Sequence, residues 1–286
     1  MFNSQLSQAV ENFAAMMLPF SDKELENKWI WKDHDEEGIR FAFFVTLQEL
    51  RQLAVTLSTL RPKLTPAQHI LSQYHAAYLD LQAAMFGVSS EDADKVFAEG
   101  EWNLKRVYAH IMGADINFTI VVRYALEGHR AGNWKPEQSS DEDDTRLSGM
   151  SEDAFRSLVQ GPLDGMLSYH RTFHPKVIED FSQITDAELD LPATFWEETR
   201  FPIRHRLHRY EAHYTQHIIQ FDKTLVAIGL PPNESKRLIR KLYAALAEVE
   251  GAMIGAERTD DAAILAVASS IAERTKEIKD LITVGE

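Results

Sequence analysis

Two histidines, His213 and His217, lie four residues apart in "EAHYTQHIIQ", residues 211–220, and Gln220 follows one turn later. On an α-helix, residues four apart lie on one face, so both imidazoles can be offered to one metal ion. The spacing alone is not diagnostic, because 11 histidines among 286 residues give about 0.4 such pairs by chance. His170 and His174 in "YHRTFH" have the same spacing. The rest of the chain has to decide between metal ligands and ordinary bundle histidines.

A third ligand has to come from another helix, and His110 in "EWNLKRVYAHI" is the best candidate. The residues one turn after it, Gly113 and Ala114, are small and leave space beside the imidazole. His174 is directly followed by Pro175, which disfavours the α conformation for His174 and weakens the case for the second pair. The residues alone leave two interpretations open, a metal site built from His110 and the 213/217 pair or three satisfied core histidines, and the spacing does not decide between them.

Glutamines and arginines surround the pair on the same predicted helix. Gln220 shares its face and can hydrogen-bond a ligand or a bound water, and Gln216 is a second candidate for positioning a nucleophile. Near the start of that helix, His205 and His208 lie beside three arginines, Arg204, Arg206 and Arg209. That cluster could bind an anion, although a solvated helix end is the simpler interpretation.

Composition excludes several other kinds of site and partner. The chain has no Cys, hence no disulfide, no thiolate ligand and no cysteine nucleophile. It contains no Gly-rich phosphate loop, no G-x-S-x-G elbow and no H-E-x-x-H motif. A net charge of -14 argues against nucleic acid or an anionic membrane as a partner. No secretory signal and no long uncharged apolar run is apparent, so we expect a soluble cytoplasmic protein.

Apolar residues recur with helical rather than alternating spacing, which predicts an all-α fold. Four helices are expected over residues 65–87, 103–128, 151–181 and 203–228. Thr65 and Asn103 are suited to cap the first two, and the third is expected to be interrupted at Gly161-Pro162 and again near Pro175. The polar, acidic residues 129–150 are expected to form a loop that crosses the bundle.

Further helices are expected at both ends of the chain. They cover residues 4–17 and 36–60, followed after residue 230 by a helical hairpin. We therefore expect an N-terminal extension, 1–64, a four-helix bundle, 65–230, and a C-terminal hairpin, 231–286. The apolar stripe of the hairpin either packs on the bundle or forms a homodimer interface.

Three of these segments together resemble the DinB family of metal-binding four-helix bundles. "LSQYHAAYLDLQAAMFG" fits its first helix, and "EWNLKRVYAHI" resembles the start of its second, where a Trp precedes the first ligand histidine. The most specific match is "RLHRYEAHYTQHIIQFDKTLVAIG", with its histidine pair, Gln and Lys-Thr-Leu segment. The resemblance covers about residues 65–230. It implies a metal triad of His110, His213 and His217.

The resemblance also implies a range of activities. Three imidazoles without a carboxylate leave coordination positions open and suit a divalent transition metal such as zinc, nickel or iron. Family members include thiol-dependent S-transferases, so we expect an enzyme that activates a low-molecular-weight thiol or water toward a small-molecule substrate. One alternative is a non-enzymatic, stress-related metal-binding or interaction bundle, and another is iron-dependent sulfur or oxygen chemistry at the same triad.

Overall fold

The computed structural model of the protein describes residues 4–32, 38–197 and 199–284. The fold is all-α, as predicted, and the described strands are a two-residue antiparallel pair, β1 (Pro192–Ala193) and β2 (Phe201–Pro202). The chain divides into two compact units. A terminal unit contains Met1–Lys63, Leu79–Gly87 and Leu230–Glu286, and a bundle unit contains Leu64–Tyr78 and Val88–Gly229. Each unit is described by itself.

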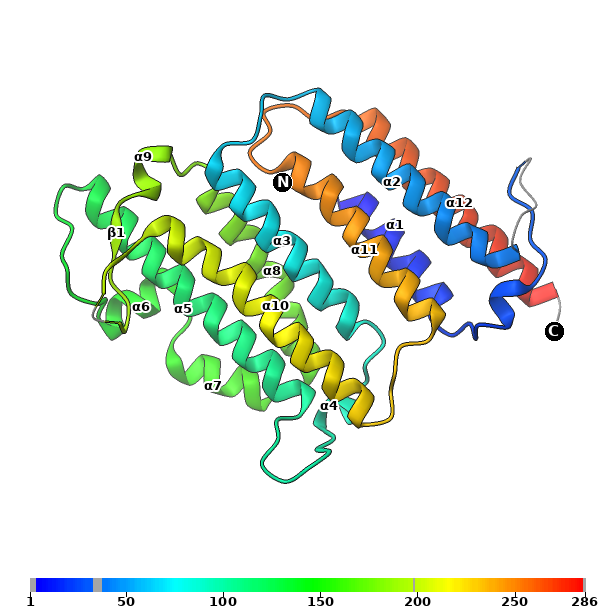
Figure 1. Cartoon of the computed structure of the whole chain (residues 1–286), viewed down its shortest axis with the longest axis horizontal. Coiled ribbons are helices and arrows are strands. Elements are labelled where there is room, and N and C mark those ends of the chain that lie inside the picture. The colour runs from blue at the N-terminus through cyan, green and yellow to red at the C-terminus, as the bar shows by residue number, and fades with distance from the viewer. Residues whose placement is uncertain (1–3, 33–37, 198, 285–286) are drawn as a thin grey trace. The chain divides into compact units, whose positions relative to one another are not determined.

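The bundle unit is built on four long helices that match the four predicted ones (Figure 1). They are α3 (Pro66–Met85, up to Tyr78 in this unit), α5 (Leu104–Arg130), α8 (Leu163–Phe181) and α10 (Ile203–Ala227). Shorter helices connect them: α4 (Ser90–Asp94), α6 (Asp141–Ser148), α7 (Glu152–Gln160) and α9 (Asp186–Leu189). Both predicted caps are present, since the Gln68 N–H donates to Thr65 Oγ1 at 3.3 Å and the Arg106 N–H to Asn103 Oδ1 at 2.9 Å.

The acidic stretch after α5 is not the loop that its composition predicts. Ser140 caps helix α6, because its side chain accepts a hydrogen bond from the Asp143 N–H at 3.2 Å. The Asp143 carboxylate in turn accepts a hydrogen bond from the Ser140 N–H. Gly149 ends the helix in the left-handed conformation, at φ 71°. Acidic residues in the first turn stabilise a helix N-terminus, so the same charges that suggested a solvated loop support a short helix that packs on α5.

The third predicted helix is divided where the sequence indicates. Gly161-Pro162 separates α7 from α8, but α8 then continues through Pro175 without a break. The expectation that Pro175 would take His174 out of helical geometry was therefore wrong. The preference of residues before proline is overridden here because His174 and Val177 on either side of the proline are buried in the core.

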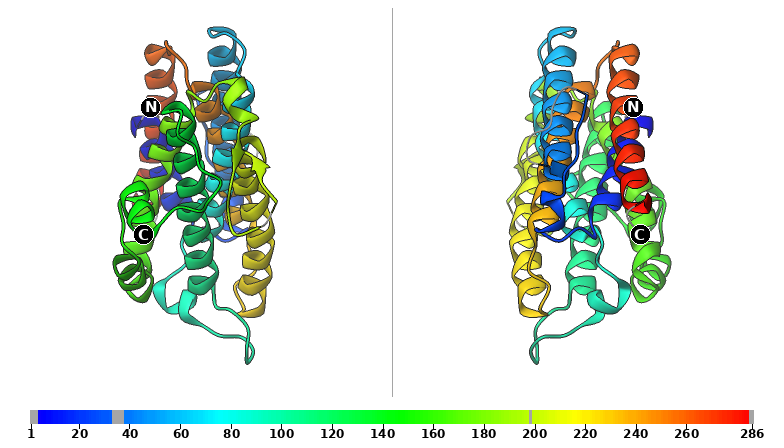
Figure 2. Two further views of the ribbon diagram at one scale, coloured as in Figure 1. Left: turned by 90° about the vertical axis from the view of Figure 1, so that its left-hand side faces the viewer. Right: turned by 90° about the vertical axis from the view of Figure 1, so that its right-hand side faces the viewer.

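The terminal unit contains α1 (Ser4–Met17), α2 (Phe41–Thr59), α11 (Glu234–Met253) and α12 (Asp261–Val284), with 3-10 turns at Glu24–Glu26 and Gly38–Arg40. Of the helix expected over 36–60, residues 36 and 37 lie outside the described residues. Helices α1 and α12, from the two ends of the chain, pack side by side (Figure 2). The core includes Phe13 against Phe43, and Arg274, fully buried, donates to Glu49 at 3.0 Å.

No helix among the described residues is both long enough and apolar enough to cross a lipid bilayer.

Candidate metal centre

Helices α5 and α10 bring the three predicted histidines together. The two helices lie side by side and run in opposite directions in the bundle unit (Figure 1). His110 lies in the second turn of α5, while His213 and His217 occupy successive turns in the middle of α10. Because the α10 pair is spaced by one turn, both imidazoles point toward the α5 side chain.

The ligand atoms of the three histidines all lie within 4.8 Å of one another. Nε2 of His213 lies 3.1 Å from Nε2 of His110. Nitrogens that share a tetrahedral ion at about 2.1 Å lie about 3.4 Å from each other, so this separation is close to that of ligands. Among the described residues no other group of three histidine and carboxylate side chains is gathered in this way.

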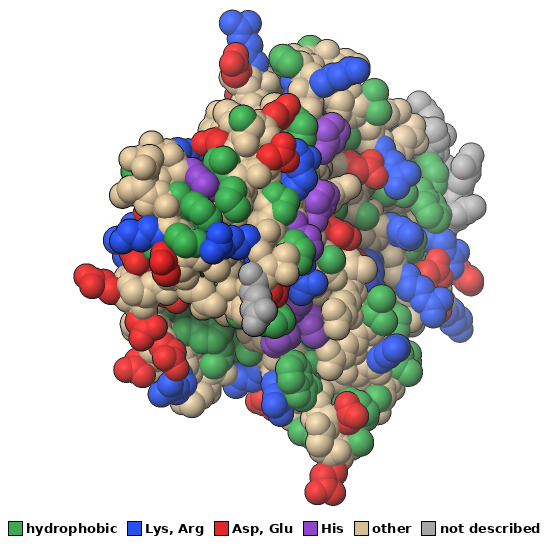
Figure 3. All heavy atoms as spheres, turned by 60° about the vertical axis from the view of Figure 1, so that its left-hand side comes forward, with side chains coloured by type: hydrophobic (Ala, Val, Ile, Leu, Met, Phe, Trp, Pro, Cys, Tyr) green, Lys and Arg blue, Asp and Glu red, His purple; other side chains and the backbone are tan. Residues whose placement is uncertain are grey.

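Burial differs among the three histidines. His213 and His217 are each 8% exposed, whereas His110 is exposed. The site is therefore anchored in the bundle on the α10 side and open on the α5 side. Figure 3 shows histidine side chains reaching the surface on one face of the molecule. An open side is what a small molecule needs in order to reach a metal held by three ligands.

Burial keeps two imidazoles of the triad in the neutral form. It lowers the pKa of His213 to about 3, helped by the neighbouring His217, His110 and Arg209. Burial and His217 also lower the pKa of His110. A neutral imidazole has a free lone pair and a protonated one has none, so His213 and His110 are in the form that binds metal at neutral pH.

A hydrogen bond fixes the orientation of His217. Its Nδ1–H donates to Oε1 of Gln220 at 2.9 Å, which leaves Nε2 as the nitrogen with the free lone pair. Gln216, the other glutamine singled out in the sequence, is exposed one turn before Gln220. The buried Nδ1 of His213 has no hydrogen-bond partner among the described residues. The residues present therefore fit a metal ion through three imidazole nitrogens, one of them oriented by an amide.

Aromatic rings contact the triad from both ends. The Trp102 ring meets His110 edge-on at 5.2 Å between centroids, and Phe118 meets His213 edge-on at 5.8 Å. Gly113 does not provide the open space that its size suggested, because a Cβ there would lie 3.1 Å from the Phe155 ring. Gly113 therefore lies against the Phe155 side chain of helix α7.

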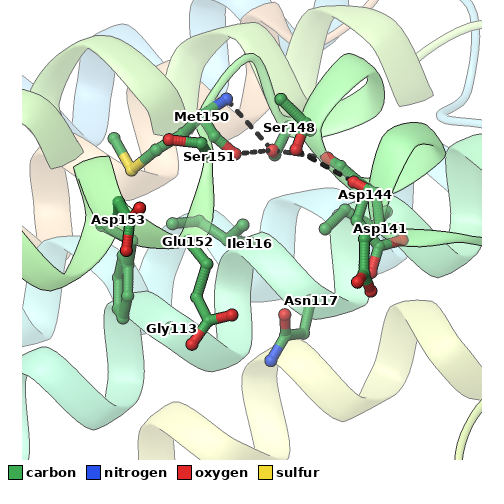
Figure 4. Close-up of a pocket in the computed structure, with 13 residues that line it drawn as sticks. Gly113, Ile116, Asn117, Asp141, Asp144, Ser148, Met150, Ser151, Glu152 and Asp153 are labelled. Atoms are coloured by element: carbon green, nitrogen blue, oxygen red, sulfur yellow. Dashed lines mark hydrogen bonds between the residues drawn. The ribbon is translucent and has the colours of Figure 1, made fainter.

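A pocket of about 580 Å³ lies along the same flank, between α5, α6 and α7. In Figure 4, Asp141 and Asp144 of α6 lie on one side of it, Glu152 and Asp153 of α7 on the other, and Asn117 belongs to α5. Its lining is negative, and none of these four carboxylates is hydrogen-bonded to a histidine of the triad. The pocket and the triad are thus different environments on one helix.

The second histidine pair lies elsewhere, in the core of the bundle unit. His170 and His174 are fully buried, and His174 Nε2 lies 2.9 Å from Nδ1 of His75. His170 Nε2 lies 3.0 Å from the carboxylate of Asp115. These histidines belong to the core and not to the triad, although the buried Nδ1 of His174 has no hydrogen-bond partner among the described residues. His205, near the start of α10, stacks on the Phe201 ring at 4.1 Å.

Asp115 was not singled out from the sequence, although it organises the bundle core. Its Oδ2 accepts hydrogen bonds from the hydroxyls of Tyr74 and Tyr214, each at 2.6 Å, as well as from His170. The signal was present, because Asp115 is the single carboxylate in the largely apolar run "AHIMGADINFTIVV". A buried carboxylate requires such donors.

The sequence matches one protein family. The family model described as the DinB superfamily matches residues 73–221, slightly more than half of the chain, and this range includes all three histidines. Comparison with curated proteins and with solved structures found no match. The four-helix bundle unit and the extent of the family match lead to one conclusion: the chain belongs to the DinB superfamily.

Proposed function

We propose that His110, His213 and His217 bind one divalent transition metal ion, zinc, nickel or iron, in a metal-dependent enzyme. The reaction is the activation of a low-molecular-weight thiol or water, in the manner of a thiol S-transferase. The observation that carries this proposal is the gathering of three imidazole nitrogens within 4.8 Å. Structural zinc sites are closed by four protein ligands, so a set of three leaves room for a reactant.

The residues of the chain have distinct roles in this proposal. Gln220 holds His217 so that Nε2 faces the triad. Trp102 and Phe118 cover the two ends of the triad and limit the access of water. The chemistry that a divalent ion supplies at such a site is a lowered pKa of thiol or water, and hence a nucleophile near neutral pH. Because the chain has no Cys, the thiol has to be a cosubstrate.

The first test is the metal content of protein purified without a histidine tag. We expect about one transition metal ion per chain in the wild type and none in His213→Ala, because two ligands hold an ion weakly. His208→Ala is the matched control, since it removes an exposed histidine from the same helix and is expected to keep the metal. Absence of metal from the wild type after reconstitution would contradict the proposal.

The second test is turnover with a thiol and an electrophile, followed as loss of free thiol. The metal-loaded wild type and His208→Ala are expected to accelerate the reaction, and His213→Ala is expected to return it to the uncatalysed rate. Equal turnover by wild type and His213→Ala would show that the triad is not the reactive site. A wild type that binds metal yet accelerates no thiol reaction would favour a structural ion.

A further inference from the structure

An arginine that forms no ion pair with a carboxylate of the described residues lies beside the triad. Arg209 precedes His213 by four residues on α10, so the two side chains share a helix face. Its guanidinium carbon lies 5.9 Å from the centre of the Phe118 ring, and that ring contacts His213 edge-on at 5.8 Å. Arg209 therefore lies on the ring that covers the His213 end of the triad.

The arginines nearest to it along the helix are paired, whereas Arg209 is not. Arg204 lies 2.8 Å from Asp190 and Arg206 lies 2.8 Å from Glu197. Arg209 is exposed and forms no ion pair with any of the described residues. The chain has 44 acidic residues and 30 basic ones, so carboxylates that could pair with Arg209 are abundant. We therefore ask which ligand Arg209 could bind instead.

The other end of the triad has a similar arrangement, in which an arginine lies over an aromatic ring that contacts a histidine. The guanidinium carbon of Arg106 lies 4.6 Å from the Trp102 ring, which contacts His110 edge-on. Arg106 and His110 have the same four-residue spacing as Arg209 and His213, and their helices are antiparallel. The three imidazoles thus lie between two arginines, and each arginine lies over an aromatic ring.

Such a setting favours an anion. The triad contributes no negative charge, and a cation bound to it adds positive charge, so neither arginine is there to stabilise metal binding. A guanidinium held on a ring face keeps its N–H groups free and oriented, and its two parallel donors match a carboxylate. The neighbouring α6–α7 pocket, with its four carboxylates, repels the same ligand.

We propose that Arg209, held on Phe118, binds the carboxylate of a small anionic substrate while the reactive end of that substrate lies at the three-histidine site. This inference rests on the proposed function and names its substrate class. The carboxylate belongs either to the thiol or to the electrophile. Arg209 is a binding residue in this proposal and takes no part in bond making.

The experiment compares charged and neutral reactants of matched size. The thiols are 3-mercaptopropionate and 2-mercaptoethanol, and the electrophiles are iodoacetate and iodoacetamide; in each reaction the thiol sulfur displaces iodide and loses its proton to buffer. The chain has no Cys, so no protein thiol competes for the electrophile. Wild type, Arg209→Gln and Arg204→Gln are assayed for kcat/KM, for metal content and for thiol affinity by calorimetry. Arg204→Gln removes the same charge from the same helix but outside the site.

We expect the wild type to prefer the carboxylate form of one reactant by about tenfold, the size of a charge-assisted hydrogen bond pair. Arg209→Gln is expected to lose that preference with its metal content and its affinity for 2-mercaptoethanol unchanged, and Arg204→Gln to keep it. Loss in the thiol series assigns the carboxylate to the thiol, and loss in the electrophile series assigns it to the electrophile. A wild type without any preference, or a preference that survives in Arg209→Gln, overturns the proposal.

Failure of the proposed function is recognised separately, by a wild type that binds no metal. In that case propionate is titrated into the metal-free protein, and the ring signals of His213 are followed by NMR. A shift in the wild type that is absent from Arg209→Gln supports the anion site without a metal. No shift in the wild type overturns it.

Discussion

At the scale of single residues, the amide of Gln220 decides which nitrogen of His217 faces the triad. The Nδ1–H of His217 donates to it at 2.9 Å, and without that acceptor the ring loses one fixed tautomer and orientation. We expect Gln220→Leu to weaken metal binding about 10- to 100-fold, the usual loss for such a supporting residue. Competition against a chelator of known affinity measures it.

Gln216 provides the matched comparison for that prediction. It is exposed on the same helix, and no described residue is hydrogen-bonded to its side chain. Gln216→Leu is therefore expected to leave metal affinity within about twofold of the wild type. Equal losses in the two variants would mean that the Gln220 bond has no special role at the site.

The lowered pKa of His213 predicts how the metal-free protein responds to acid. In the unfolded chain this histidine titrates near 6.5, but burial lowers its pKa in the folded protein to about 3. Between these values the unfolded chain binds a proton that the folded one does not, so stability falls as the pH drops through this window. Above pH 6.5 the contribution is constant.

The measurement is the melting temperature of metal-free protein at several pH values from 7.5 to 4. We expect a decline below pH 6.5 that is shallower in His213→Gln, because that variant has lost one of the responsible groups. His174, whose pKa is held well below its usual value by burial, maintains part of the decline in the variant. An identical slope in both proteins would contradict the assignment of the shift to His213.

At the scale of elements, Asp115 connects α5 to the other three long helices of the bundle unit. One carboxylate oxygen accepts from Tyr74 of α3, His170 of α8 and Tyr214 of α10. Asp115→Ala removes the acceptor that three buried donors share, and of these the Tyr214 hydroxyl and His170 Nε2 keep only their contact with each other. We therefore expect it to cost about 3–5 kcal/mol of stability. Urea unfolding followed by circular dichroism measures the loss.

Tyr74→Phe is a milder change at the same hydrogen-bond network and serves as the comparison for Asp115→Ala. It removes one hydroxyl and leaves Asp115 with two donors, so about 1–2 kcal/mol is expected. If Asp115→Ala costs no more than Tyr74→Phe, the carboxylate does not organise the core. The metal content of Tyr74→Phe is expected to stay at the wild-type value, since Tyr74 does not contact the triad.

Much of the element pattern could be predicted because it depends on local signals. The caps at Thr65 and Asn103 and the break at Gly161-Pro162 are each encoded within a few residues. Helix α6 was missed because its acidic residues have the composition of a solvated loop as well as of a helix start. The gathering of His110 with the α10 pair could be inferred only from the family resemblance, since periodicity says nothing of which helices are neighbours. Asp115 and Arg209 depend on such neighbours, so their partners could not be read from the sequence.

At the scale of the whole molecule, the N- and C-terminal segments belong to the terminal unit, and the candidate site belongs to the bundle unit. All three histidines, Gln220 and Arg209 belong to the bundle unit. The two ends of the chain are joined in the terminal unit, where the guanidinium of Arg274, fully buried, bonds to Glu49 and Thr46. This arrangement predicts that damage to the terminal unit lowers stability without changing the site.

Arg274→Met tests that separation. Removing a buried guanidinium leaves Glu49 without its partner, so we expect a loss of about 3 kcal/mol or more and an earlier thermal transition. Metal content and affinity at 20 °C are expected to equal those of the wild type, because the ligands and Gln220 belong to the bundle unit and this ion pair to the terminal unit. Glu49→Gln, which keeps an acceptor for Arg274, is expected to cost less. If metal affinity falls in parallel with stability in both variants, the triad depends on the terminal unit for its geometry, and the two units act as one.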